Sequence, residues 1–205
     1  MGSLSELQVQ DVALVRGERV VQRGLDFRAA AGCSLAIGGR NGAGKTSLLR
    51  AIAGLLEPAS GSIVVRLNDG RTIVSADERG SFVGWVGHQN AIKPQLTPAE
   101  HLEFHARYFR RDDRIDEALE RSGLADLRDV PAQYLSAGQQ RRIAFARLIL
   151  MGRPLWLLDE PFSALDLHGR ALVRDLVANH CAGGGVVLAA THEPIGTGTP
   201  SIELA

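Results

Sequence analysis

The chain has 205 residues, of which 45% are hydrophobic, and this is enough apolar material for one well-buried globular domain. Its 23 basic and 23 acidic side chains balance to a formal charge of zero, so the composition gives no sign of a surface that binds nucleic acid or another polyanion. The start MGSLSELQVQ lacks the pattern of a signal peptide, and no apolar stretch is long enough to span a membrane, so we expect a soluble chain.

The first third of the chain is expected to contain strands, then a glycine-rich loop and a helix. Residues 7–15 (LQVQDVALV) alternate between apolar and polar side chains, and residues 20–27 (VVQRGLDF) continue an antiparallel pair. Residues 33–39 (CSLAIGG) form a short apolar strand that ends in glycines. Residues 46–55 (TSLLRAIAGL) then carry apolar side chains at helical spacing.

A hairpin, followed by alternating helices and strands, is expected in the rest of the chain. The tripeptide Asn-Asp-Gly at 68–70 separates the apolar runs 63–67 and 71–74, and these residue types tolerate the positive φ of a tight turn. Thr97 and Glu100 match a capping box, which predicts a helix start. The other expected elements are strands at 82–88, 154–160 and 185–191 and helices at 98–121, 137–151 and 166–182. Short buried strands between helices indicate an α/β fold with a mainly parallel sheet.

The glycine cluster GRNGAGKT (39–46) predicts a phosphate-binding loop. It fits G-x-x-x-x-G-K-[ST] and lies between an expected strand and an expected helix, as that pattern requires. Bare backbone N–H groups and the start of the helix favour a phosphate, Lys45 should reach the β and γ oxygens, and Thr46 should ligate Mg²⁺. A glycine-rich turn with a chance lysine is the alternative. The predicted nucleotide-binding residues are Gly39, Arg40, Asn41, Gly42, Ala43, Gly44, Lys45, Thr46 and Ser47.

Two adjacent carboxylates end the apolar stretch PLWLLDE (154–160), at the edge of the sheet where open α/β folds bind ligands. Asp159 is predicted to hold Mg²⁺, directly or through water. Glu160, the next residue, is predicted to polarise the attacking water and so to be catalytic. An ordinary solvated strand end is the alternative, which the phosphate loop makes less attractive.

A serine and small residues precede the helix expected at 137–151, in the stretch LSAGQ (135–139). Ser136 and the free amides of residues 137–139 could form a second anion site at the helix start. By itself this pattern is much more typical of a plain helix N-cap.

Taken together, the motifs resemble those of the ATP-binding cassette (ABC) family. GRNGAGKT, Gln89, LSAGQ, LLDEP, SALD (163–166) and His192 follow one another in the family's order and at about its spacings, over essentially the whole chain. The resemblance implies an α/β fold, with a P-loop NTPase (RecA-like) core, an antiparallel β-subdomain and a helical signature subdomain at roughly 90–145. All of these would lie in a single ABC ATP-binding domain, residues 1–205.

The same resemblance assigns roles to the remaining motif residues. Gln89 would contact Mg²⁺ and water, and His192 would act catalytically as the switch histidine on the γ-phosphate. The signature residues would face ATP across a dimer interface, where Asp166 would be a dimer contact; they are Ser136, Ala137, Gly138 and Gln139. The chain departs from the family in having LSAGQ for LSGGQ and in lacking an aromatic residue near the first hairpin to stack on adenine. Arg16 is predicted to stack there instead.

Finally, the stretches 86–104, 23–27 and 130–148 resemble the ATPase subunits of bacterial heme export systems that serve cytochrome c maturation. This implies an ATP-hydrolysing translocase subunit with ATP and Mg²⁺ as cofactors, peripheral on the cytoplasmic face of the inner membrane. Its partners would be a second copy of itself and integral membrane subunits, with no nucleic acid. Covalent heme is not expected, because no CxxCH occurs, and His101 and His105 lack a metal-binding pattern. The alternatives are another small ABC export system, a non-transport cassette ATPase and a small-molecule kinase. A kinase of that kind would lack the LSAGQ segment that this chain has.

Overall fold

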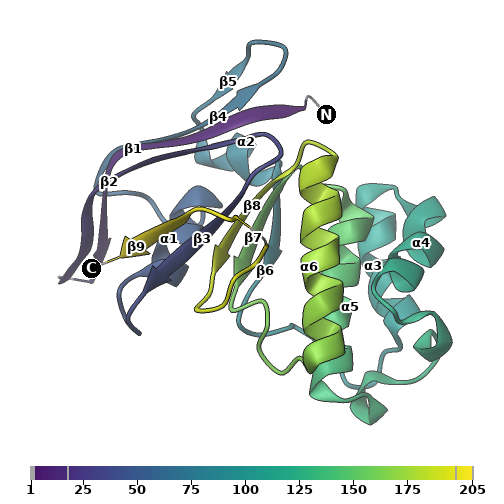
Figure 1. Ribbon diagram of the computed structural model, residues 1–205. Helices are drawn as coiled ribbons and strands as arrows, with labels where there is room; N and C mark the ends of the chain where they lie inside the picture. The colour runs from purple at the N-terminus through teal and green to yellow at the C-terminus, as the bar shows by residue number, and fades with distance from the viewer. Residues whose placement is uncertain (1–2, 18, 197, 205) are drawn as a thin grey trace.

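The first part of the chain forms an antiparallel sheet in the computed structural model, which describes residues 3–17, 19–196 and 198–204. Across these residues the strands of this sheet lie in the order β2-β1-β4-β5 (Figure 1). They are β1 (Leu4–Arg16), β2 (Arg19–Ala30), β4 (Ser60–Leu67) and β5 (Thr72–Ile73). Strands β4 and β5 pair antiparallel on either side of residues 68–70, which confirms the predicted hairpin.

A second sheet is parallel in all its described pairings and has the strand order β6-β7-β8-β3-β9. Its strands are β3 (Ser34–Gly39), β6 (Val83–Val86), β7 (Leu155–Asp159), β8 (Val186–Ala190) and β9 (Ser201–Leu204). Every residue of the central strands β7 and β8 is buried, as parallel strands covered on both faces require. The predicted parallel sheet is thus confirmed.

The parallel sheet lies between two hydrophobic cores (Figure 1). On one face it packs against the helices α5 (Ala137–Met151) and α6 (Leu167–Ala182). The helices α3 (Pro98–Phe109) and α4 (Ile115–Arg121) pack on α5 in the same core. On the other face, α1 (Lys45–Ile52) fills the space toward the antiparallel sheet. Alternate residues of β7 enter the two cores, because side chains alternate between the faces of a strand: Trp156 and Leu158 face one core, and Leu155 and Leu157 face the other.

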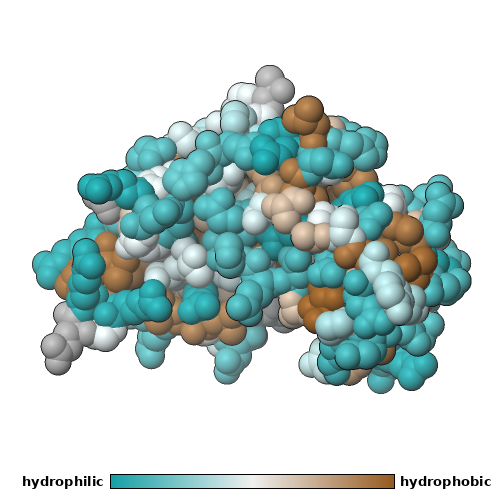
Figure 2. Space-filling model, turned by 90° about the horizontal axis from the view of Figure 1, so that it is seen from below, coloured by the Kyte–Doolittle hydropathy of each residue, from teal (hydrophilic) through white to brown (hydrophobic). Residues whose placement is uncertain are grey.

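The surface outside these cores is mainly hydrophilic. Figure 2 shows one face of the molecule on which teal predominates and the hydrophobic residues form separate areas. This is the usual consequence of placing most large apolar side chains inside.

Three details differ from the sequence prediction. The helix expected at 98–121 is interrupted, because Arg110 adopts a left-handed conformation (φ 54°) that ends α3; a short 3₁₀ helix η1 (Asp112–Arg114) then leads into α4. Strand β9 was not predicted; it is a short edge strand whose only sheet partner is β3 in the described pairings. The short helix α2 (Ala76–Gly80) was also missed, since five residues show no clear period.

Candidate functional site

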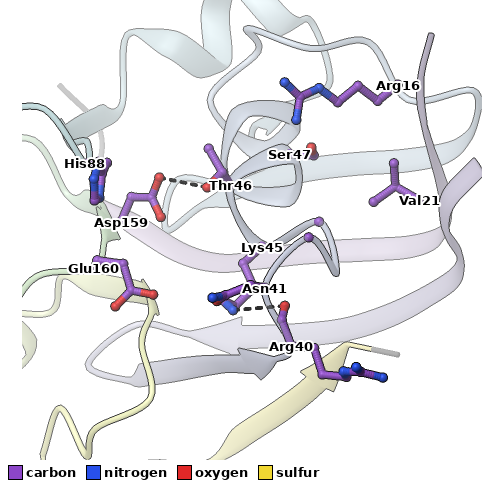
Figure 3. Close-up of a pocket in the computed structure, with 12 residues that line it drawn as sticks. Arg16, Val21, Arg40, Asn41, Lys45, Thr46, Ser47, His88, Asp159 and Glu160 are labelled. Carbon is purple, nitrogen blue, oxygen red and sulfur yellow. Dashed lines mark hydrogen bonds between the residues drawn. The ribbon is translucent and has the colours of Figure 1, made fainter. Parts of the chain in front are cut away.

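A cavity of about 380 Å³ opens at the carboxyl ends of strands β3 and β7 (Figure 3). The loop between β3 and α1 forms one wall, and the end of β7 forms the other, so two motifs more than 110 residues apart meet there. The lining residues are Arg16, Val21, Arg40, Asn41, Gly42, Gly44, Lys45, Thr46, Ser47, His88, Asp159 and Glu160.

Glycine is needed in the loop between β3 and α1 for steric reasons. Gly39 has φ 127°, and a Cβ there would lie 2.7 Å from the carbonyl oxygen of Leu204. Gly44 has φ 97°, and a Cβ there would lie 2.5 Å from a methyl group of Val21. Any larger residue would therefore combine an unfavourable backbone conformation with a clash. The same loop leads into α1 without a side-chain cap on Gly44, so the positive end of the helix is open to the cavity.

Lys45 is held so that its charge remains available to an anion. Its Nζ donates to the carbonyl oxygens of Gly39 (2.6 Å) and Arg40 (3.3 Å), although the residue as a whole is buried. In the part of the chain that the structure describes, no carboxylate forms an ion pair with it. A buried cation beside an uncapped helix start is well suited to a phosphate group.

Thr46 and Asp159 form the contact that joins the two walls of the cavity (Figure 3). The Thr46 hydroxyl donates to Asp159 Oδ2 at 2.9 Å, and Asp159 is only 5% exposed. Among the described residues no group of three or more His, Cys, Asp and Glu side chains could hold a metal by itself. One carboxylate and one hydroxyl fit Mg²⁺, which proteins bind with few side-chain ligands and additional phosphate oxygens.

Glu160 and His192 lie close to the lysine. His192 Nε2 is 3.4 Å from Lys45 Nζ and 3.9 Å from Glu160 Oε1. Both side chains are partly exposed, and Glu160 has a positive φ of 49°. His192 also lines a neighbouring cavity that β9 helps to form. A carboxylate, an imidazole and an ammonium group thus converge at one end of the phosphate loop.

Gln89 is not brought to this cavity. It lies at a separate cavity of about 140 Å³ together with His105 and Arg147. His88, one residue earlier, takes a position in the wall of the main cavity (Figure 3). Sequence reasoning missed His88, and the only available signal was its place just after strand β6.

The signature residues lie at the start of α5, away from the cavity of their own chain. Ser136 Oγ accepts a hydrogen bond from Gln139 N (3.2 Å), and Gln139 Oε1 accepts one from Ser136 N (2.8 Å), so the pair forms a capping box. Ala137 and Gly138 complete the first turn. Asp166 similarly caps α6, where its Oδ1 accepts a hydrogen bond from Gly169 N at 2.7 Å. None of these residues lines the cavity beside Lys45.

No helix within the described residues is long and apolar enough to cross a membrane.

Comparisons with known proteins give consistent results. A family model described as ABC transporter matches residues 22–163. The chain is 48% identical over 183 residues to the cytochrome c biogenesis ATP-binding export protein CcmA of Rhodopseudomonas palustris (strain BisB5), with 89% of each chain covered. It is 45% identical over 204 residues to the protein of the same name from Rhizobium meliloti (strain 1021), with 97% of each covered.

A similar solved structure is that of a dimeric ATP-binding cassette in a post-hydrolysis state, bound to ADP and Pi. It superposes with a TM-score of 0.76 at 25% identity, and the match covers 91% of this chain and 88% of that chain. The similarity to known proteins therefore extends over nearly the whole sequence and over both sheets.

Proposed function

The chain belongs to the ABC transporter family and, within it, to the cytochrome c biogenesis ATP-binding export proteins, and on this premise we propose how its residues bind and hydrolyse ATP. It has the P-loop NTPase fold of the ABC ATPases, and it is the nucleotide-binding, ATP-hydrolysing subunit of an export system.

The phosphates of ATP bind to the loop at 39–46 and to Ser47, at the start of α1. Lys45 exchanges its carbonyl contacts for the β- and γ-phosphate oxygens, because an ammonium group gains more from an anion than from neutral acceptors. Thr46 and Asp159, together with Gln89, hold Mg²⁺. When bound, this ion neutralises charge on the β- and γ-phosphates. Gln89 can reach it only if the loop after β6 moves from its position in this structure.

Glu160 and His192 are the catalytic residues of the proposal. Glu160 polarises the attacking water as general base, and His192 donates a hydrogen bond to the γ-phosphate. The positions of these side chains support the assignment. His192 Nε2 lies 3.4 Å from Lys45 Nζ and 3.9 Å from Glu160 Oε1.

The adenine lies toward Arg16, on the wall formed by the first two strands. A planar guanidinium can stack on a base where the family often has an aromatic ring. Arg16 and Val21 line the same cavity as Lys45, so one nucleotide could contact all three residues.

A second copy of the chain completes the site. Because the signature at 136–139 does not line the cavity of its own chain, its contact with ATP requires another subunit. The Ser136 hydroxyl accepts a hydrogen bond from Gln139 N, so its own proton is free to donate to a phosphate across the interface. Asp166, exposed at the start of α6, is the dimer contact. The similarity to a dimeric cassette supports this arrangement.

The cargo is heme, and the process is cytochrome c maturation. This part of the proposal rests on the name and the near-complete coverage of the curated relatives. The chain acts as a single ATP-binding domain, peripheral on the cytoplasmic face of the inner membrane, where integral membrane subunits of the export complex carry the heme. The signature-bearing helical subdomain spans roughly 90–145.

The observation that carries the proposed chemistry is the meeting of the phosphate loop and the end of β7, joined by Thr46 and Asp159. Lys45→Ala should abolish ATPase activity, because it removes the cation that neutralises triphosphate charge. Glu160→Gln should keep nucleotide binding but lower the hydrolysis rate by about 10²- to 10⁴-fold. Phosphate release measures the rate, and calorimetric titration with Mg·ATP measures binding.

The matched control is Lys93→Ala, which removes the only other lysine of the sequence. Lys93 is exposed and does not line the cavity. It should hydrolyse ATP at the unmodified rate. Normal hydrolysis by the Lys45 variant would refute the phosphate-site assignment, and normal hydrolysis by the Glu160 variant would remove Glu160 from the mechanism.

A further inference from the structure

Arg141 is a buried cation between α5 and the loops that follow β6 and β7. It lies five residues after Ser136, and its side chain is only 1% exposed. Burial lowers the pKa of Arg141 to about 10, so the group remains charged at neutral pH. A charge at this depth is costly unless it is well satisfied by hydrogen bonds and nearby opposite charge. We therefore expect the guanidinium of Arg141 to be fully hydrogen-bonded to neighbouring acceptors.

The guanidinium holds two loops together. Its Nη2 donates to the carbonyl oxygens of Asp159 (2.9 Å) and Glu160 (2.8 Å), after strand β7. Its Nη1 donates to the carbonyl oxygen of Gly87 (2.6 Å) and to Asn90 Oδ1 (2.8 Å), after strand β6. Its Nε also donates to the carbonyl oxygen of Pro161 (3.5 Å). Five acceptors on the two segments are thus bound by one planar group, a geometry that a lysine cannot reproduce.

The contact with Glu160 restrains an unfavourable backbone conformation. Glu160 has φ 49°, in the left-handed region that residues other than glycine seldom occupy. Such conformations persist only where the surroundings impose them. Here the Glu160 N–H donates to the carbonyl oxygen of Ala190 (2.9 Å), and the Glu160 carbonyl accepts from Arg141 (2.8 Å) and from Ser163 N (3.2 Å). Both peptide groups that flank the Glu160 side chain are thus held, and Arg141 supplies the only side-chain donor among these three described hydrogen bonds.

The loop after β6 is tied to the same helix at a second point. Arg147, on α5, donates to the carbonyl oxygens of Asn90 and Ala91. Gln89 lies between the Gly87 and Asn90 contacts of Arg141. A single helix, whose first turn is the signature segment, therefore makes contacts with both the Gln89 loop and the backbone of Glu160.

We propose that Arg141 is a positioning residue that couples the signature helix α5 to the direction of the Glu160 carboxylate and to the Gln89 loop. A displacement of α5, caused by a second subunit or by a membrane partner, would then change the position of the group that activates water. This inference rests on the proposed function of the same site. It adds a residue that does not line the cavity beside Lys45.

The first test compares substitutions of neighbouring arginines on α5. Arg141→Met should lower kcat at least tenfold while KM for ATP changes less than about twofold, because the phosphate loop is untouched. Arg141→Lys keeps the charge but only part of the hydrogen bonding. Its kcat should lie between that of Arg141→Met and that of the unmodified chain. The matched control is Arg142→Met, which removes a side chain bonded to the carbonyl oxygen of Gly123 (3.1 Å), and it should retain normal kcat. A rise in KM with unchanged kcat for Arg141→Met would overturn the inference.

A double-mutant cycle separates positioning from general damage to the fold. If Arg141 acts through Glu160, single-turnover hydrolysis should fall much less when Arg141→Met is added to Glu160→Gln than when it is added to the unmodified chain. Equal, additive losses would overturn the inference and leave the role of Glu160 intact. Normal hydrolysis by Glu160→Gln alone would instead refute the proposed function, so the two failures can be told apart.

Asn90→Ala provides a test that does not require a buried charge to be removed. It deletes one acceptor of the Arg141 guanidinium at a partly exposed position. We expect a several-fold lower kcat with unchanged KM. If the Arg141 variants fail to fold, an unchanged kcat in Asn90→Ala overturns the inference.

Discussion

At the scale of single residues, we expect His180 to make the stability of the fold depend on pH. Its ring stacks on Trp156 with centroids 3.9 Å apart, and its Nε2 contacts the carbonyl oxygen of Pro154 at 3.1 Å. Burial is the main cause that lowers the pKa of His180 to about 4. The unfolded chain, with a histidine pKa near 6.5, therefore binds a proton at a higher pH than the folded chain does.

The sign of the effect follows directly. Stability from neutral His180 is fully present above pH 6.5 and is lost progressively as the pH falls toward 4. By linkage, His180 should contribute a decrease of about 2 kcal/mol in the free energy of unfolding between pH 7.5 and pH 5. Urea unfolding at a series of pH values measures it. His180→Phe keeps an aromatic ring and should reduce this dependence by that amount. The part due to His101 and His105, whose pKa values burial also lowers, should remain.

His168→Phe is the control, because His168 is exposed on the same helix α6. It should leave the pH dependence unchanged. An equally steep dependence in His180→Phe would show that another group is responsible.

At the scale of elements, the start of α3 shows a local signal that the structure confirms. Thr97 Oγ1 accepts a hydrogen bond from Glu100 N (3.2 Å), and Glu100 Oε2 accepts one from Thr97 N (2.8 Å), as the sequence predicted. His101 supports the same turn, with one ring nitrogen 2.8 Å from the Thr97 carbonyl oxygen and the other accepting from Lys93 N (3.0 Å). Both nitrogens of His101 thus contact the backbone.

Removing this cap should weaken the helix without affecting the cavity. Thr97→Ala should lower the free energy of unfolding by about 1 kcal/mol, because the Glu100 amide at the helix start loses its side-chain acceptor. Thermal or urea unfolding measures the change. Thr72→Ala, at an exposed position of β5, should change stability by less than about 0.5 kcal/mol. Equal stability of the Thr97 variant and the unmodified chain would mean that the capping hydrogen bonds add nothing to the fold.

At the scale of the whole molecule, the separation between the signature and the phosphate loop predicts a nucleotide-dependent dimer. In Glu160→Gln the bound ATP is not hydrolysed, so it should remain between the phosphate loop of one copy and Ser136 of the other. Because ATP then binds the dimer more tightly than the monomer, mass action should favour the dimer. Size-exclusion chromatography with and without Mg·ATP measures this.

The control is Glu160→Gln combined with Lys45→Ala, which should remain monomeric at the same ATP concentration. A Glu160→Gln chain that hydrolyses slowly yet stays monomeric, even with its membrane partners present, would refute the two-copy arrangement. It would leave the proposed chemistry of Glu160 intact.

Much of the fold was predictable from the sequence, because those features depend on residues close together in the chain. The phosphate loop, the hairpin at 68–70 and the cap at Thr97 are each set by φ preferences and short-range hydrogen bonds. The parallel sheet followed from short apolar runs between helices. The comparisons then confirmed the ABC family and its P-loop fold.

The tertiary structure alone decided which residues meet across that framework. The added strand β9 depends on pairing with β3, which is distant in the sequence, and local periodicity does not record such contacts. The break in the helix at Arg110 is a change of backbone conformation that the apolar spacing does not record either. The same holds for His88, which lies in the cavity wall where Gln89 was expected. It also holds for Arg141, because the sequence pattern shows it only as another charged residue of a helix. Local preferences set the elements, whereas burial and hydrogen bonds between residues far apart in sequence determined how the site is assembled.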